Sequence, residues 1–253
     1  MKLVKNILGR FFAAWAMLTF IITMLIILLP TWAMGLYPEP KRTRKFIALS
    51  RIWMAVWLPL AGIRLVIKGK EKFKKGENYV VVCNHNSFMD VPVTSPGIPG
   101  ANKTIAKKSF VYVPLFGWIY RFATVIVDRK DHNSRKESFD NMVKVLNNGL
   151  DMLIYPEGTR NKTTEPLKSF YDGAFKLSVE TQKPIIPVVI LYTKKILPAR
   201  PILYFTPGKI DMHILPAIFP QGHTKDSLKQ AVYDEMAKYY LENNDKKNHN
   251  FNA

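Results

Sequence analysis

Short apolar runs rich in β-branched residues recur along the chain beyond residue 64, each bounded by polar or turn-forming residues. This pattern is typical of β-strands. The runs are RLVIKGK (64–70), NYVVVCNH (78–85), ATVIVDR (123–129), DMLIY (151–155) and KPIIPVVIL (183–191). We therefore expect these segments to be strands of one sheet.

Helical spacing predicts an α-helix over residues 133–148, between the third and fourth of these runs. Its apolar stripe consists of Phe139, Met142, Val143 and Leu146. Asn133 or Ser134 would cap its start. Gly149 would stop it, because glycine readily adopts the left-handed conformation that ends many helices.

Two further helices are predicted at residues 170–181 and 227–241, followed by a polar tail over residues 242–253. The alternation of strands and helices predicts an α/β fold with a mixed β-sheet flanked by helices. The sequence contains no internal repeat, so we expect one layered domain over residues 65–241.

The N-terminal part breaks this pattern, because residues 11–38 contain no charged side chain. The run exceeds the roughly 20 apolar residues that span a bilayer core, and the roughly 7 to 15 of a signal peptide. It predicts a hydrophobic helical membrane anchor within residues 1–64. Basic residues flank the run on both sides, so the charge pattern does not choose its orientation.

A second apolar stretch, residues 46–63, contains Arg51 and the tryptophans Trp53 and Trp57. Two interpretations stay open. In the first, the arginine and the tryptophans lie among lipid headgroups, and the two stretches form a hairpin dipped into one leaflet. In the second, a single span is followed by a core helix.

The formal net charge of +18 implies an anionic partner such as nucleic acid, anionic lipid or an acidic carrier protein. The apolar N-terminal segment favours an anionic membrane surface over nucleic acid. Cys83 is the single cysteine, which excludes an internal disulfide bond and fits a reducing compartment. The isolated His132, His213, His223 and His249 have no metal-ligand spacing, so no metal site is predicted.

The stretch NHNSFMD (84–90) places His85 and Asp90 five positions apart where a strand is predicted to end. On a continuous helix this spacing is a rotation of about 140°, which would separate the two side chains. Pro92 favours a helix that begins near Val91, so a turn would lie between them. The imidazole could then act as a general base whose tautomer the carboxylate fixes. The alternative is a helix-capping aspartate beside an ordinary loop histidine.

The stretch YPEGTR (155–160) follows another predicted strand, and its tight turn presents Glu157 and Arg160. Arg129 ends the strand ATVIVDR in a similar way. A guanidinium fork matches a phosphate group, and ligands of α/β sheets gather beyond the carboxyl ends of strands. Both arginines and His85 could therefore converge on one anionic substrate, although each arginine alone is more often a surface ion-pair partner.

NHNSFMD, ATVIVDR, YPEGTR and IPVVI (186–190) resemble, in the same order, the four sequence blocks of the 1-acyl-sn-glycerol-3-phosphate acyltransferase family. IAKKSFVYVPLFGW is also similar to this family, and the resemblance covers about residues 64–215. It implies a membrane-associated enzyme that moves an acyl chain from acyl-CoA or acyl carrier protein to a lysophospholipid, usually lysophosphatidate. We expect no cofactor and no nucleic acid partner. We also expect the protein in an inner or cytoplasmic membrane, with its active site facing the cytoplasm.

By matching position, the resemblance implies that His85 is the general base and that Asp90 orients it. It also implies that Pro187 shapes an acyl channel. The implied glycerol phosphate site comprises Arg129, Glu157, Gly158, Thr159 and Arg160.

The sequence departs from the family pattern in three places. Ala123 stands where the second block usually opens with glycine, and Asn161 replaces a common serine after EGTR. Tyr171 and Asp172 occupy positions where two lysines are usual. The lost positive charge keeps another lyso-lipid open as the acceptor.

Three other interpretations stay open at this point. A lipid or thioester hydrolase could use the same imidazole and carboxylate with water in place of the alcohol. Cys83 lies two positions before His85 on the same strand face, so a covalent acyl-cysteine is an alternative to direct attack. A cysteine in a valine run is, however, usually a small buried hydrophobe. A nonenzymatic basic module would explain the charge but neither motif.

Overall fold

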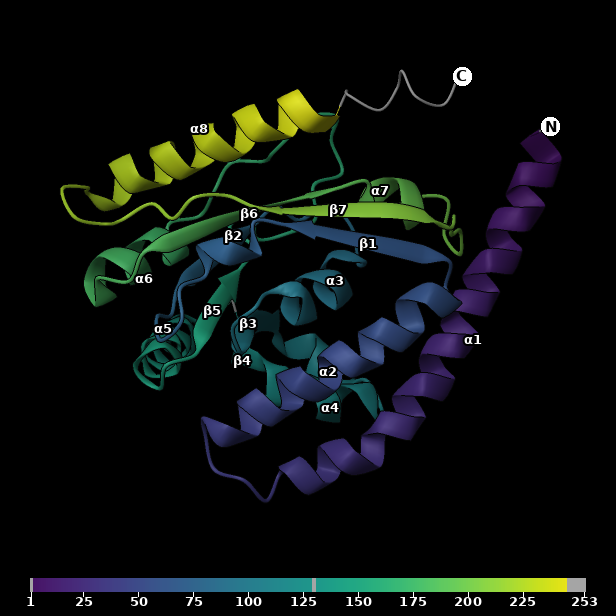
Figure 1. Ribbon diagram of the computed structural model, residues 1–253, viewed down its shortest axis with the longest axis horizontal. Coiled ribbons are helices and arrows are strands. Elements are labelled where there is room, and N and C mark those ends of the chain that lie inside the picture. The colour runs from purple at the N-terminus through teal and green to yellow at the C-terminus, as the bar shows by residue number, and fades with distance from the viewer. Residues whose placement is uncertain (1, 129–130, 245–253) are drawn as a thin grey trace.

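One β-sheet forms the centre of the molecule (Figure 1). The computed structural model describes residues 2–128 and 131–244. The strands are β1 (Ile63–Lys68), β2 (Val80–Cys83), β3 (Asn102–Lys107), β4 (Thr124–Val127), β5 (Asp151–Ile154), β6 (Ile185–Leu191) and β7 (Gly208–Ile214). Their order across the sheet is β1-β7-β6-β2-β5-β3-β4.

The sheet is mixed, because its strands from β6 to β4 run parallel while β7 runs antiparallel to β6 and parallel to β1. The carboxyl ends of the parallel strands therefore meet at one edge, where polar segments follow β2 and β5. The predicted class, an α/β fold with a mixed sheet, is confirmed.

Helices cover both faces of this sheet. They are α1 (Lys2–Met34), α2 (Lys41–Leu60), α3 (Asp90–Gly97), α4 (Phe116–Ala123), α5 (His132–Asn147), α6 (Gly173–Thr181), α7 (Thr193–Ile196) and α8 (Lys225–Asn244). Two short 3₁₀-helices are η1 (Lys70–Lys72) and η2 (Lys108–Tyr112). Figure 1 shows α8 on one face, α2 and α3 on the other, and α1 beside α2.

Successive residues of the central strands point to two separate hydrophobic cores, as the two-residue period of a strand requires. In β2, Val81 and Cys83 belong to the core that α1 and α2 complete. Val80 and Val82 belong to the core with α5, α6 and α8. Because both faces are covered, these strands are continuous apolar runs rather than alternating ones.

The helices α5, α6 and α8 lie where helical spacing predicted them. The predicted cap of α5 is wrong, because the side chain of Asp131 caps the helix by accepting from the N–H of Asn133 at 2.9 Å. Ser134 Oγ instead accepts from the N–H of Asp128 at 3.0 Å. Several neighbouring residues here have side chains that can cap a helix, and the path of the backbone decides which of them does so. Gly149 follows the helix with a φ of 68°, as predicted.

The strands β3 and β7 were not predicted. β3 alternates buried and more exposed positions and carries three polar residues among its first three, so it lacks an apolar run. β7 carries Asp211 and His213 in buried positions. Asp211 forms an ion pair with Lys209 at 2.7 Å, and His213 contacts the hydroxyl of Tyr239 in α8. The partner of Asp211 lies two residues before it in the same strand. The partner of His213 comes from a helix distant in sequence, and the local pattern does not reveal it.

The two tryptophans of α2 are buried against α1. Trp53 Nε1 donates to Thr23 Oγ1 at 2.9 Å, and Trp57 Nε1 donates to the carbonyl of Ala16 at 3.2 Å. The residues Trp53 and Trp57 are only 8% and 5% exposed. Helix packing therefore buries these tryptophans between α1 and α2, and the hairpin in one leaflet and the single span both stay predictions.

Arg51 is also held by the protein. Its guanidinium donates to the carbonyls of Pro96, Ile98, Pro99 and Gly100 at 2.6 to 3.2 Å. These carbonyls lie at and just beyond the C-terminal end of α3, where a cation is favourable. The protein therefore supplies the hydrogen-bond partners of Arg51, and α2 contributes to the core of the sheet.

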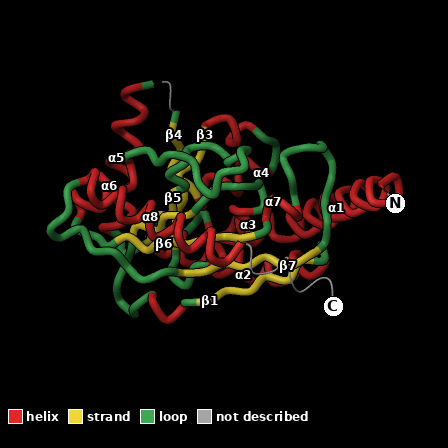
Figure 2. The backbone as a smooth tube through the Cα atoms, turned by 90° about the horizontal axis from the view of Figure 1, so that it is seen from above, coloured by secondary structure: helices red, strands yellow, loops and turns green. Residues whose placement is uncertain are grey.

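The outer surface of α1 is apolar. The helix is long and apolar enough to cross a membrane. Figure 2 shows its N-terminal part extending beyond the rest of the molecule. Large side chains with at least half of their area exposed include Leu3, Val4, Ile7, Phe11, Met17, Leu18, Ile26, Leu29 and Trp32. The predicted boundary between an anchor of residues 1–64 and a domain of residues 65–241 stays a prediction, since α2 shares the core of the sheet.

Candidate active site

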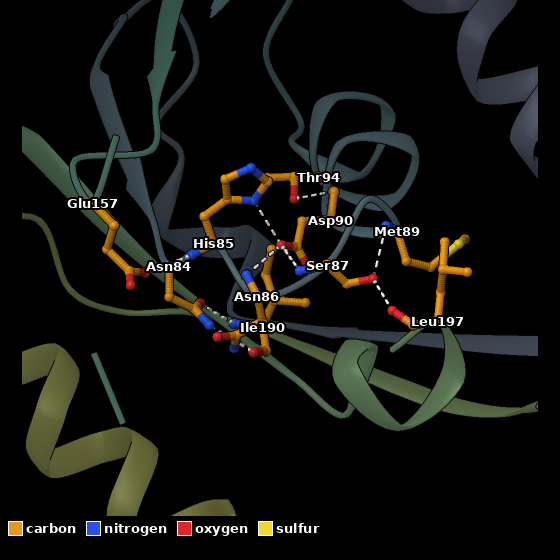
Figure 3. Close-up of polar contacts among 10 residues, drawn as sticks. All are labelled: Asn84, His85, Asn86, Ser87, Met89, Asp90, Thr94, Glu157, Ile190 and Leu197. Atoms are coloured by element: carbon orange, nitrogen blue, oxygen red, sulfur yellow. Dashed lines mark hydrogen bonds and ion pairs between the residues drawn. The ribbon is translucent and has the colours of Figure 1, made fainter. Parts of the chain in front are cut away.

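The stretch NHNSFMD forms the connection from the carboxyl end of β2 to the start of α3 (Figure 3). His85 Nδ1 and Asp90 Oδ2 are 2.8 Å apart. The same oxygen accepts from the N–H groups of Asn86 and Ser87 at 2.6 and 2.7 Å. Asp90 is the first residue of α3, so the turn that the spacing of the pair demanded is present, with the carboxylate at a helix N-terminus.

This geometry sets the proton arrangement of His85. A carboxylate oxygen can only accept a hydrogen bond, so Nδ1 carries the proton and the other ring nitrogen, Nε2, carries the lone pair in the neutral imidazole. The side chain of His85 is 17% exposed, whereas that of Asp90 is fully buried. In this arrangement His85 can act as a general base. Asp90 orients its imidazole and stabilises the positive charge that the imidazole acquires.

Two neighbouring polar residues fix the turn, as Figure 3 shows. Asn84 forms two hydrogen bonds with the main chain of Ile190 in β6, at 2.7 and 2.9 Å. Ser87 Oγ donates to the carbonyl of Leu197 at 2.7 Å and accepts from the N–H of Met89. The turn is thus tied to β6 and to the segment that follows α7.

Tyr155 lies against the imidazole, with the ring centroids of His85 and Tyr155 4.5 Å apart. Burial raises the pKa of the Tyr155 hydroxyl, so the ring stays neutral. Burial also raises the pKa of the Cys83 thiol well above its usual value. A thiolate is the nucleophilic form, so this environment disfavours the acyl-cysteine alternative.

Glu157 joins the two motifs through the main chain. Its Oε1 accepts from the N–H of His85 at 2.7 Å, and its Oε2 accepts from the N–H of Lys168 at 3.0 Å. The residue is 1% exposed, and burial raises the pKa of its carboxyl group. Gly158 follows with a φ of 69°, a conformation that favours glycine and allows the tight turn. Glu157 therefore holds the main chain at His85 and at Lys168 together and so helps to shape the site.

Asn161, which stands where the family often has serine, also links the segment after β5 to the turn that carries His85. The N–H of Asn161 donates to the carbonyl of His85 at 2.6 Å. Its side chain accepts from the N–H and the hydroxyl of Thr163 and donates to the carbonyl of Glu165. Asparagine thus organises the next turn of the chain as a serine could also do.

Arg160 lies over the ring of Phe88, with Cζ 3.6 Å from the ring centroid. No carboxylate forms an ion pair with this guanidinium among residues 2–128 and 131–244. An aromatic face holds the plane of a guanidinium without occupying its in-plane N–H donors. Arg160 therefore combines a defined position with donors available for an anion. Thr159, beside it, accepts a hydrogen bond from Lys168 Nζ at 2.8 Å.

The carboxylate of Asp172 forms ion pairs with two lysines of α8. Lys225 and Lys229 of α8 contact its two oxygens at 2.8 and 2.7 Å. These hydrogen bonds lower the pKa of the Asp172 carboxyl group. The neighbouring Tyr171 is 70% exposed. Two cations supplied by α8 thus stand beside the position where the family usually has lysine.

Two predicted residues remain. Arg129 falls outside the described residues. Pro187 is buried inside β6, opposite Val82 of β2. Ala123 is the last residue of α4, directly before β4. The role of Pro187 in an acyl channel stays a prediction.

Sequence reasoning missed Asn84, Ser87, Phe88 and Tyr155 as parts of the site. Asn84 and Ser87 had a signal, because small polar residues at a strand end often bind nearby main chain. Phe88 and Tyr155 had none, since their partners come from segments distant in sequence.

Comparisons with known proteins agree with this geometry. A family model described as Acyltransferase matches residues 64–191, just over half of the 253 residues. A 1-acyl-sn-glycerol-3-phosphate acyltransferase of Saccharomyces cerevisiae is 30% identical over 196 residues, 74% of this chain and 63% of the relative. One from Cocos nucifera is 33% identical over 169 residues, 62% of this chain and 53% of the relative.

The fold is also that of a solved structure, a 1-acyl-sn-glycerophosphate (LPA) acyltransferase from Thermotoga maritima. The TM-score is 0.74 at 24% identity, and the match covers 96% of this chain and 97% of the other. The chain spans between about half and three fifths of the length of the curated relatives named above. Because the family model covers both the histidine motif and the EGTR motif, the chain belongs to the acyltransferase family.

Proposed function

We propose that the protein transfers an acyl chain from an acyl thioester to the free sn-2 hydroxyl of 1-acyl-glycerol-3-phosphate, which makes phosphatidic acid. The contact of His85 Nδ1 with Asp90 Oδ2 carries this proposal, because it leaves Nε2 available as a base at the sheet edge. The names of the relatives support the choice of substrate.

In the proposed reaction, His85 Nε2 takes the proton of the acceptor hydroxyl while its oxygen attacks the thioester carbonyl. The tetrahedral intermediate then expels the thiolate, and the imidazolium returns the proton to that sulfur. Asp90 stabilises the transient positive charge of the imidazolium. An alcohol can attack a thioester directly once a base removes its proton, so no covalent enzyme intermediate is required.

The acceptor phosphate would bind Arg160, whose guanidinium is held by Phe88 and has no carboxylate partner in the described part of the chain. Arg129 would provide a second fork. Glu157, Gly158 and Thr159 would shape this phosphate site through the turn rather than by direct charge. Acyl-CoA or acyl carrier protein would be the donor.

The proposed reaction takes place at a membrane surface, with the active site on the cytoplasmic side. α1 is apolar enough to hold the protein there, and the net charge of +18 favours an anionic leaflet. A lysolipid could then reach His85 without leaving the interface.

The test is to incubate the purified protein with a panel of lyso-lipids and with both donor types, and to identify products by mass spectrometry. We expect phosphatidic acid from lysophosphatidate, and none from a matched His85→Ala preparation. Free fatty acid as the main product would instead identify a hydrolase. A diacyl product from another lyso-lipid, with lysophosphatidate inert, would overturn the acceptor but not the reaction.

A further inference from the structure

The loop of residues 197–206, which follows α7, is fixed to the turn that carries His85. Ser87 Oγ donates to the carbonyl of Leu197 at 2.7 Å. The N–H of Thr206 donates to the carbonyl of Ile196 at 2.9 Å and so closes the base of the loop. A loop with joined ends is a compact unit of the surface. The position of this loop is therefore set by the same contacts that hold the catalytic motif.

The far side of loop 197–206 is docked on α1, and Figure 1 shows the segment between α7 and β7 beside that helix. The N–H of Phe205 donates to the carbonyl of Gly9 at 2.9 Å, and the side chain of Phe205 is buried. A Cβ atom on Gly9 would lie 2.1 Å from the ring of Tyr204. Glycine at this position leaves room for the ring of Tyr204 against α1.

The tip of loop 197–206 presents two apolar side chains to its surroundings. Ile202 is 77% exposed and Leu203 is 57% exposed. Leu203 has a φ of 55°, in the left-handed region that side chains other than glycine rarely adopt. A strained backbone that leaves an apolar side chain more than half exposed points to a role of this side chain at another surface.

The surroundings of the tip match a lipid interface. Next to Gly9, α1 exposes Ile7 and Phe11, which are 59% and 64% exposed. The apolar tip therefore belongs to a loop that contacts α1 at Gly9, within the part of the helix whose side chains are exposed and apolar. Arg10 and Arg200 are exposed beside Gly9 and the tip, where cations fit anionic headgroups.

We propose that loop 197–206 inserts Ile202 and Leu203 into the anionic leaflet that α1 contacts. The loop thereby forms a second membrane contact that seats the His85 turn at the lipid surface. This inference rests on the proposed function, in which the acceptor lipid reaches the site from the membrane.

The test uses the full-length protein with a single nitrobenzoxadiazole label at Leu203→Cys. The matched control is Leu241→Cys on α8, since Leu241 is 56% exposed. The reference for the anchor is Ile22→Cys on α1, where Ile22 is 49% exposed. The native Cys83 is fully buried, so the unchanged protein serves as the labelling control. Emission is recorded with phosphatidylcholine vesicles, with and without phosphatidylglycerol, and with doxyl-labelled lipids as quenchers.

We expect the labels at positions 203 and 22 to shift to the blue and to be quenched, more strongly with phosphatidylglycerol, and the label at 241 to stay water-exposed. The pair Ile202→Ser and Leu203→Ser should weaken vesicle partition about tenfold, because two apolar side chains lose their burial. The control pair Phe219→Ser and Leu241→Ser should not.

A label at position 203 that stays water-exposed while the label at 22 is quenched would overturn the inserted loop and leave the proposed function standing. Shielding of position 203 without vesicles, dependent on protein concentration, would assign the tip to a second copy of the chain and also overturn it. Loss of quenching at both positions would overturn the loop together with the anchor. The product assay remains a separate readout of acyl transfer.

Discussion

The Nε2 atom of His85 is the site of the first prediction, because Nδ1 is engaged by Asp90. His85→Ala should lower turnover by about 10² to 10⁴, the usual contribution of a general base. Asp90→Asn should also be severely impaired, since an amide cannot stabilise the imidazolium. Turnover is measured with saturating lysophosphatidate, and circular dichroism checks the fold.

Cys83→Ala is the matched control for these variants, and it should retain most activity. Near-normal turnover of His85→Ala would contradict the proposed base. A trapped acyl-cysteine would favour the covalent route, against the buried, neutral thiol of Cys83.

Arg160 and Phe88 carry the second prediction, because the ring holds the guanidinium at 3.6 Å from its centroid. Arg160→Ala should reduce kcat/KM for lysophosphatidate about 10- to 150-fold, since charge-assisted hydrogen bonds are lost. Arg160→Lys should restore only part of it, because an ammonium has no fork. Phe88→Leu should raise the acceptor KM about 2- to 5-fold, and Phe88→Tyr should restore it.

The double variant of Arg160→Ala and Phe88→Leu distinguishes positioning from general packing. Phe88→Leu should add nothing once the guanidinium is absent. Additive losses would show that Phe88 acts independently of Arg160. A loss of donor affinity with normal acceptor KM would mean that Arg160 binds the phosphates of the donor.

At the scale of elements, the start of β5 contains a buried carboxyl group. Burial raises the pKa of Asp151 to about 7, although it accepts from the N–H of Tyr79 and lies near the charge of Arg51. A carboxyl whose pKa is higher in the folded state binds more protons there. Its contribution to stability is therefore complete below pH 4 and is lost as the pH rises to about 7.

Asp151→Asn should remove this dependence, because an amide oxygen can still accept from Tyr79 and carries no charge. Relative to the unchanged protein, the free energy of unfolding of the variant should rise between about pH 4 and 7. Urea titrations at several pH values measure it. A constant difference across this range would contradict a protonated Asp151 in the folded protein.

At the scale of the whole molecule, the outer surface of α1 should bind the membrane. Replacing Ile22, Ile26 and Leu29 by serine should weaken vesicle binding strongly, because these exposed side chains would lose their lipid contacts. Turnover on a soluble short-chain substrate should change less than turnover on vesicles. Co-sedimentation and the two assays give these quantities. Equal losses on both substrates would point to damage of the core instead.

Elements with a clear hydrophobic periodicity could be predicted from the amino-acid sequence alone. Continuous apolar runs predicted β2, β5 and β6, and a helical stripe predicted α5, because periodicity reports burial directly. The separation of His85 from Asp90, with Pro92 beyond them, predicted the turn that brings the two side chains together. The motifs NHNSFMD and YPEGTR could be placed at strand ends because each directly follows an apolar run.

Features that depend on contacts between segments distant in sequence could not be predicted from local patterns. β7 is a strand although it buries His213, because Tyr239 of α8 contacts that side chain. Trp53 and Trp57 face α1 instead of lipid, since a tryptophan N–H satisfies a protein acceptor as well as an interfacial one. The stacking of Arg160 on Phe88 joins segments about 70 residues apart, and no local pattern records a contact of that separation.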